Sequence, residues 1–183
     1  MFQLVMPATD RRGARARLLG RLDRAWTDFR ESYAGLPEAS LMEPGVTGDW
    51  SVKDVLAHVM TWEAEALKHL PVVLAGGRPP RYARYGGIDA FNAEQTRENR
   101  RLSLPEVLRQ LDDTHARLVE LIRRTPEAHV AHHTRFRRRL RLDTYGHYPE
   151  HAAAIRAWRR VKGPRPATLN RRSGRRRRAT SAR

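Results

Sequence analysis

The stretch that decides the fold is residues 48–63, which read GDWSVKDVLAHVMTWE. Ser51 is a preferred N-cap residue, and Asp54 three positions later completes the pattern of a capping box. The apolar positions that follow recur every three or four residues and so share one face of a helix: Val55, Val59, Trp62, Ala66 and Leu70. His58 lies on the same face. We expect this helix to end before Pro71, which lacks a backbone donor.

Two other segments have the same helical spacing. The first contains Leu18, Leu19, Leu22, Trp26, Phe29 and Tyr33, and it ends where Gly35 and Pro37 supply a C-cap glycine followed by a proline. The other begins with a second capping box, formed by Ser103 and Glu106, and continues through Val107, Leu108, Leu111, Leu118, Leu121 and Ile122. Both patterns predict long amphipathic helices.

A fourth, shorter helix is indicated by an apolar face near the C-terminus: Tyr148, Ala152, Ile155 and Trp158. Pro149 would break an interior turn, so two alternatives stand. Either the helix begins near His147 with Pro149 in its first turn, or the helix is kinked at Pro149. Between the third and fourth helices, residues 135–141 contain five arginines, which we interpret as an exposed basic strip.

The connections between these helices are long. Residues 41–49 and 76–87 are rich in glycine and proline and predict loops, and Asp89 is expected to cap a short helix after the second loop. No segment shows sustained alternation of apolar and polar residues. The sequence therefore predicts an all-α fold, a four-helix bundle with long connections.

The charge of the chain is concentrated at its C-terminus. The formal net charge is +16, and residues 163–183 hold eight arginines and no acid, so the remainder carries 28 basic and 20 acidic residues, a net +8. A segment of Arg, Pro, Gly, Ser and Thr buries too little apolar area to fold. We predict a flexible N-terminus at 1–15, one bundle domain at 16–162 and a disordered Arg-rich tail at 163–183.

The absence of cysteine excludes disulfides, thiolate metal sites and a cysteine nucleophile, and it fits a reducing compartment. No apolar run is long enough to cross a bilayer, and the apolar start at residues 1–6 is too short for a signal peptide. We therefore expect a cytoplasmic protein without a membrane contact.

Three of the eight histidines are placed where they could share a metal ion. His58 occupies the apolar face of the second helix, where a lone histidine is more often a core residue than a ligand. His147 and His151 are four residues apart, which would stack both imidazoles on one helical face. This spacing suits two ligands of one divalent ion, although a surface pair would explain it equally well.

The other histidines are weaker candidates. His132 and His133 are expected to face solvent, whereas His69, His115 and His129 have no partner at a diagnostic spacing. Four acids flank the candidate ligands and could accept a hydrogen bond from an imidazole N–H: Glu63, Glu65, Asp143 and Glu150. A charged helix surface, or an N-cap role for Asp143, is the simpler interpretation for each. The aromatic residues nearby could line a pocket, although core packing is their simpler role: Trp62, Tyr145 and Tyr148.

Residues 48–59 followed by Trp62-Glu63, together with residues 143–151, resemble the signatures of the DinB/YfiT-like superfamily. Further stretches resemble its ClbS/DfsB branch: residues 33–36, 44–50 and 86–92. The similarity spans roughly residues 16–160, and Pro149 is the main departure from the pattern. The resemblance implies a DinB-like four-helix bundle. It also implies that a histidine of the second helix joins a later pair to bind a divalent metal, which here gives His58, His147 and His151 as ligands of Zn, Ni, Fe or Mn.

The resemblance also sets the functional expectations. Members of the superfamily include thiol-dependent transferases, hydrolases and a resistance protein that opens a reactive cyclopropane. We therefore expect a metal-dependent hydrolase or transferase that acts on a small electrophilic molecule, in resistance or detoxification, with any thiol arriving as a low-molecular-weight cosubstrate. Two alternatives stand: a protein that sequesters a small molecule, and a nucleic-acid-associated protein whose tail makes non-specific contacts. A homodimer is a further expectation.

Overall fold

The computed structural model describes residues 13–162. In chain order, its elements are α1 (Ala14–Tyr33), α2 (Glu38–Leu41), β1 (Pro44–Thr47), β2 (Trp50–Ser51), α3 (Val52–Leu74), the 3-10 helix η1 (Tyr82–Tyr85), α4 (Ile88–Asn99), α5 (Leu104–Arg124), α6 (Glu127–Val130), α7 (Arg135–Asp143) and α8 (Tyr148–Lys162). The predicted tail at 163–183 and most of the predicted flexible segment at 1–15 lie outside the described residues. Helix α1 begins at Ala14, two residues before the predicted start of the domain.

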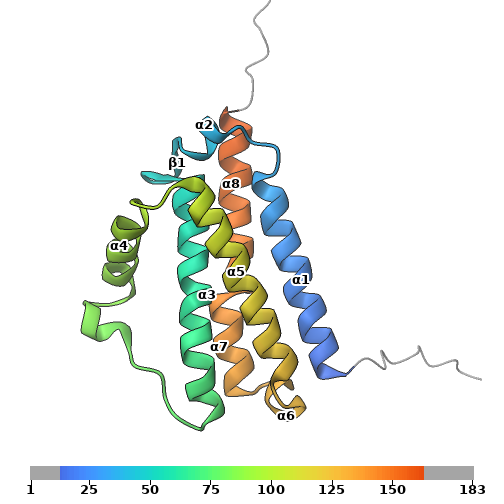
Figure 1. The fold of residues 1–183 in the computed structure, drawn as a ribbon. Coiled ribbons are helices and arrows are strands. Elements are labelled where there is room, and N and C mark those ends of the chain that lie inside the picture. The colour runs from blue at the N-terminus through green and yellow to red at the C-terminus, as the bar shows by residue number, and fades with distance from the viewer. Residues whose placement is uncertain (1–12, 163–183) are drawn as a thin grey trace, which may run out of the picture.

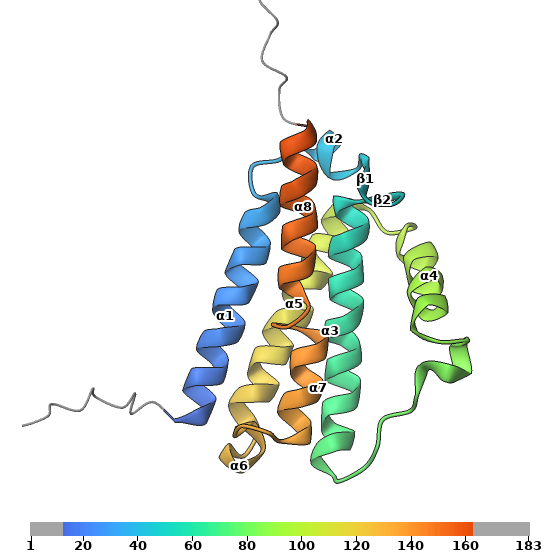
Figure 2. The ribbon, with the colours of Figure 1, turned by 180° about the vertical axis from the view of Figure 1, so that it is seen from behind.

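Four long rods form the bundle (Figures 1 and 2). Three are the single helices α1, α3 and α5, and the fourth consists of α7 and α8 placed end to end. Helix α3 packs against α5 and α7, while α1 packs against α8. The all-α four-helix bundle is confirmed, and the one sheet among the described residues is the short antiparallel hairpin of β1 and β2.

The core lies between the apolar faces that the sequence pattern marked. Fully buried side chains come from all four rods: Leu18, Leu22 and Phe29, then Val55, Leu56 and Leu70, then Leu111, Leu118 and Ile122, then Phe136, Leu140, Tyr148 and Ile155. Burying a large apolar side chain stabilises the fold by about 1.5–3 kcal/mol. Both predicted capping boxes are present, at Ser51 with Asp54 and at Ser103 with Glu106.

Two helix boundaries depend on proline. Helix α3 continues through Pro71 to Leu74, so the predicted end before Pro71 was wrong by about one turn. In α8, Pro149 lies in the first turn, where its missing N–H has no intrahelical role. Of the two alternatives for the fourth helix, the start near His147 is therefore confirmed.

The interpretation of residues 135–141 as an exposed basic strip was wrong in part. The segment belongs to α7, whose Phe136 and Leu140 are 1% and 0% exposed. These two residues are four apart and face the core together, which turns Arg137 inward to 6% exposure. Thr134, not an arginine, caps this helix by accepting a hydrogen bond from the Arg137 backbone N–H.

The segment that joins α3 to α5 stands away from the bundle on the α3 side and carries η1 and α4 (Figures 1 and 2). Tilted and edge-to-face contacts among the aromatic rings of Trp62, Tyr82 and Phe91 hold it against α3. The Tyr82 hydroxyl donates to Glu65 of α3 at 2.8 Å and accepts from Arg139 of α7 at 3.0 Å. Helix α4 starts after Gly87 rather than after Asp89, which lies within its first turn. Among the described helices, none is both long and apolar enough to cross a membrane.

Candidate metal centre

Helix α3 fixes the position of His58 two turns from its start. The Ser51 backbone N–H donates to Asp54 at 2.9 Å and the Asp54 N–H donates to the Ser51 hydroxyl at 3.1 Å, so the first turn is closed by side chains. The His58 ring is buried and contacts the rings of Trp50 and Trp62, with centroids 4.9 and 6.2 Å away. This packing restricts the imidazole to the side of α3 that faces α8.

The turn between α7 and α8 places His147, and the first turns of α8 place His151. The backbone N–H groups of His147 and Tyr148 both donate to the Thr144 carbonyl, at 2.6 and 2.9 Å. Gly146 makes this tight turn possible, because a Cβ at this position would lie 2.7 Å from the Arg141 carbonyl oxygen. His151 then follows one helical turn after His147, on the same face of α8.

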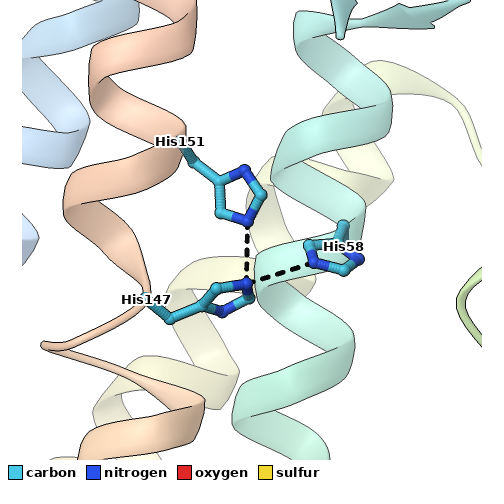
Figure 3. A group of neighbouring side chains, drawn as sticks. All are labelled: His58, His147 and His151. Carbon is cyan, nitrogen blue, oxygen red and sulfur yellow. Dashed lines mark hydrogen bonds between the residues drawn. The ribbon is translucent and has the colours of Figure 1, made fainter. Parts of the chain in front are cut away.

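The three imidazoles converge between α3 and α8 (Figure 3). Nε2 of His147 lies 3.2 Å from Nε2 of His58 and 2.8 Å from Nε2 of His151. One ligand atom from each histidine lies within 4.8 Å of the other two, and this is the one such group of metal-ligating side chains among residues 13–162. The structure thus brings together the three histidines that the sequence proposed as ligands.

All three imidazoles are favoured in the neutral form. Burial, with smaller contributions from His151 and His147, lowers the pKa of His58 to about 2. Burial, and then His147, lowers the pKa of His151 to about 3, and burial also lowers the pKa of His147. Neutral imidazole is the form in which histidine binds a metal.

Hydrogen bonding alone leaves this cluster poorly satisfied. An imidazole nitrogen carries either one proton or one lone pair, so Nε2 of His147 cannot complete a full hydrogen bond with both neighbours. Its other ring nitrogen, Nδ1, is buried and has no hydrogen-bond partner within the described part of the chain. Three nitrogens at about 2.0–2.1 Å from one zinc ion are separated by roughly 3.3 Å. The two separations from Nε2 of His147 are 3.2 and 2.8 Å. The donor set therefore fits a divalent ion.

The open side of the triad faces a cavity of about 280 Å³. His58 and His147 line it, and the other wall residues come from α3, η1, α4 and α7: Trp62, Tyr82, Ile88, Asn92, Arg139, Leu142 and Asp143. The Asn92 side-chain oxygen is buried and has no hydrogen-bond partner among the described residues. Burial raises the pKa of Asp143 to about 7, although its pairing with the Arg139 guanidinium at 2.6 Å opposes that rise.

A larger cavity of about 660 Å³ adjoins the first one, because both are lined by Tyr82, Ile88, Arg139 and Leu142. Its remaining walls are mainly apolar, with Val73, Pro79, Pro80 and Ala83 among them. Arg135 lies at its edge and donates to the carbonyls of Gly76 and Gly77, which ties the end of α3 to α7. Together the two cavities connect the histidine cluster with the surface.

The acids next to the candidate ligands have other partners. Glu63 accepts hydrogen bonds from His115 and Tyr148, and Glu65 accepts from His69 and Tyr82. Two of the acids are buried, Glu63 at 0% and Asp143 at 2% exposure, and Asp143 is the last residue of α7, so the surface and N-cap interpretations were wrong for them. Trp62 lines the cavity, whereas Tyr148 packs in the core and Tyr145 lies on the opposite side of α7.

Three residues that line the cavity were not predicted from the sequence: Tyr82, Asn92 and Arg139. Tyr82 lies in a segment that we had interpreted only as a loop, and Arg139 lies within the presumed basic strip. The one signal for Asn92 was the resemblance of residues 86–92 to the ClbS/DfsB branch.

Comparison with known proteins identifies the family. The profile of the DinB superfamily matches residues 21–154, which include α3, α5 and α7 and parts of α1 and α8. The chain belongs to the DinB superfamily. The resemblance seen in residues 48–63 and 143–151 is thereby confirmed.

Two solved structures share the fold. One, titled Sibling Lethal Factor Precursor - DfsB, aligns with a TM-score of 0.69 at 15% identity and covers 81% of this chain and 96% of its own. The other, an uncharacterised protein from Escherichia coli UTI89, aligns with a TM-score of 0.66 at 15% identity and covers 87% of this chain and 98% of its own. At this identity the likeness concerns the fold. A search of curated proteins gives no match.

Proposed function

We propose that this DinB-superfamily protein is a metal-dependent enzyme that acts on a small electrophilic molecule, as a hydrolase or as a thiol-dependent transferase. The proposal is carried by one observation: three neutral histidine nitrogens converge at the end of a cavity that opens to the surface. Three protein ligands leave a coordination position free, which is typical of catalytic zinc, whereas structural zinc has four protein ligands.

His58, His147 and His151 would hold the ion. When bound, a divalent ion of Zn, Ni, Fe or Mn supplies Lewis acidity at its free position. The cavity volume of about 280 Å³ suits a small reactant or the reactive end of a larger one. Because the chain contains no cysteine, a thiol nucleophile must come from a cosubstrate.

The other wall residues have distinct chemical capacities. Trp62 and Ile88 supply apolar surface that excludes water from the reacting group. The unpartnered oxygen of Asn92 can accept a hydrogen bond from a bound molecule. Asp143 is the acid that faces the cavity, and only one of its oxygens is paired with Arg139, so the other can hold a proton for a reactant.

Elemental analysis and metal titration of the full-length protein test the first part of this proposal. We expect about one transition-metal ion per chain after purification, or after EDTA treatment and reloading with zinc, nickel, iron or manganese. A protein that binds no stoichiometric metal under any of these conditions would contradict a metal-dependent mechanism.

Activity measurements then separate the two reaction types. A nitrophenyl ester reports hydrolysis, and a chlorodinitrobenzene with a low-molecular-weight thiol reports transfer. We expect repeated turnover by the metal-loaded protein and its loss in the EDTA-treated protein. A single equivalent of product or ligand per chain would instead indicate sequestration, the alternative function expected from the family resemblance.

A further inference from the structure

A second cleft lies between α1 and α7, on the other side of α7 from the metal-site cavity. Its larger part measures about 440 Å³ and includes Arg21, Arg137, Arg138 and Arg141 in its wall, beside His132, His133, Thr134, Tyr145 and Gly146. Its smaller part, about 150 Å³, shares Arg21, His132 and Arg137 with the larger and adds Ala16, Arg17, Gly20 and Arg24. Among residues 13–162, no acidic residue lines either part.

The arginines come from two helices and point into one space. On α1, residues 17, 21 and 24 are spaced by four and three positions and share a face. On α7, Arg137 is 6% exposed and donates to the Val130 carbonyl at 3.2 Å, which holds its guanidinium at the cleft. Arg21 and Arg141 are exposed, and within the described chain neither forms an ion pair with a carboxylate.

Three further features distinguish the cleft. Thr134 caps α7, so the positive end of this nine-residue helix opens toward the larger part. Arg137 lowers the pKa of His132, with smaller contributions from burial and from His133, Arg21 and Arg17, because one more proton would be repelled there. His133 has φ of 66°, and it is the one non-glycine residue with positive φ among the described residues. Backbone strain of this kind tends to occur at functional sites.

We infer that the α1–α7 cleft, defined as the two cavities above, binds a small molecule that carries a phosphate or pyrophosphate group. Four arginines around one cavity exceed what the two oxygens of a carboxylate can engage, whereas phosphate groups offer several oxygens to the planar guanidinium. The volume is that of a small-molecule pocket. The arginines surround a concave space and do not form a stripe along the surface, which favours a small phosphorylated compound over a nucleic-acid strand.

The cleft differs from the cavity beside the histidines, and its function does not depend on the proposed enzyme activity. The outer metal-site cavity is mainly apolar, while the α1–α7 cleft is mainly cationic. The two share only Arg138. A test must nevertheless separate them, because phosphate groups also bind metal ions.

Isothermal titration calorimetry of the full-length protein tests the inference, with inorganic pyrophosphate, ADP and adenosine as probes at an ionic strength of about 0.15 M. We expect pyrophosphate and ADP to bind and adenosine not to bind. Tighter binding of ADP than of pyrophosphate assigns a nucleotide, and the reverse order assigns an inorganic or simpler phosphate.

The variant Arg21→Gln/Arg141→Gln removes two exposed cleft arginines, and we expect it to weaken pyrophosphate binding by about tenfold or more. The matched control is Arg117→Gln/Arg160→Gln, which removes the same charge from exposed positions on α5 and α8 outside the cleft. It should change the affinity by less than about threefold. If one double variant fails to fold, as judged by circular dichroism, the single variants Arg21→Gln and Arg117→Gln provide the same comparison.

Two results would overturn the inference. Equal weakening by the cleft and control variants would show attraction by net charge alone. Loss of pyrophosphate binding in His58→Ala, with the cleft intact, would assign the probe to the histidine cluster. Binding that persists in His58→Ala and is lost in Arg21→Gln/Arg141→Gln supports the cleft, whether or not the protein proves to be a metal-dependent enzyme.

Discussion

Two buried clusters that contain histidine lie in the same bundle, and they differ in how their polar groups are satisfied. In the first, His58, His147 and His151 face one another without an acid among them. In the second, His115 donates to Glu63 at 2.7 Å and Tyr148 donates to the same carboxylate oxygen. Glu63 is 0% exposed, and the His115 ring stacks on Trp26 with centroids 3.8 Å apart.

The two clusters share their scaffold. His58 and Glu63 are five residues apart on α3 and so point to different faces of it, and Tyr148 directly follows His147. In the Glu63 cluster one carboxylate oxygen, Oε1, accepts from both donors, while the other, Oε2, is buried and has no hydrogen-bond partner among the described residues. The histidine triad contains three bases and no acid, and only a cation from outside can engage all three lone pairs. We therefore expect the Glu63 cluster to serve stability and the histidine triad to serve binding.

The largest expected effect concerns metal retention by matched alanine variants. His58→Ala should reduce bound zinc from about one ion per chain to less than about 0.1 after dialysis, because it removes one of three ligands. His115→Ala should retain the metal, because His115 lies in the other cluster. Inductively coupled plasma mass spectrometry of both variants makes the comparison. Equal retention, or equal loss, would remove the distinction between the clusters.

The next effect concerns stability, and here the Glu63 cluster is the one that is changed. Glu63→Leu leaves the His115 N–H and the Tyr148 hydroxyl buried without their acceptor, so it should lower the free energy of unfolding by about 3 kcal/mol. Glu63→Gln keeps a carbonyl acceptor and should cost about 1 kcal/mol. Urea denaturation with EDTA present measures both. Equal destabilisation by the two substitutions would indicate that charge, and not hydrogen bonding, holds this cluster together.

Local features of the fold could be predicted from the sequence, whereas most contacts between residues distant in sequence could not. The capping box at Ser51 and the apolar spacing after it are local, and local patterns specify a helix directly. The histidine triad became visible through the family resemblance, since no local pattern joins His58 to a pair 89 residues later. The pairing of Glu63 with His115, 52 residues apart, left no sequence signal. Helix α7 was missed because five arginines obscured the four-residue spacing of Phe136 and Leu140.

Acid should destabilise the folded, metal-free protein through the histidine triad. In the folded protein the pKa of His58 is lowered to about 2 and that of His151 to about 3, whereas a histidine in the unfolded chain has a pKa of 6.5. Below pH 6.5 the unfolded state therefore binds more protons than the folded state, and stability falls as pH falls. The variant His58→Leu removes one such group. When the pH is lowered from 6.5 to about 5, the free energy of unfolding of this variant should fall by about 1.5 kcal/mol less than that of the wild type. Parallel pH profiles in urea denaturation, with EDTA in both samples, would contradict this expectation.

The smallest expected effect is a difference in the free energy of unfolding between leucine variants of the two clusters at neutral pH, where protonation contributes little. Without metal, His58 lies among apolar rings, and its closest polar contact is a His147 nitrogen that is already shared with His151. Replacing it with leucine removes an imperfectly satisfied polar group, so His58→Leu should raise the free energy of unfolding of the EDTA-treated protein by about 1 kcal/mol. His115→Leu should lower it, because Glu63 would then lose one of its two buried hydrogen-bond donors. Opposite signs for two buried histidines in one core would show that His58 lowers the stability of the metal-free fold, as expected of a ligand and not of a core residue. Destabilisation by both substitutions would instead make the triad an ordinary packed part of the core.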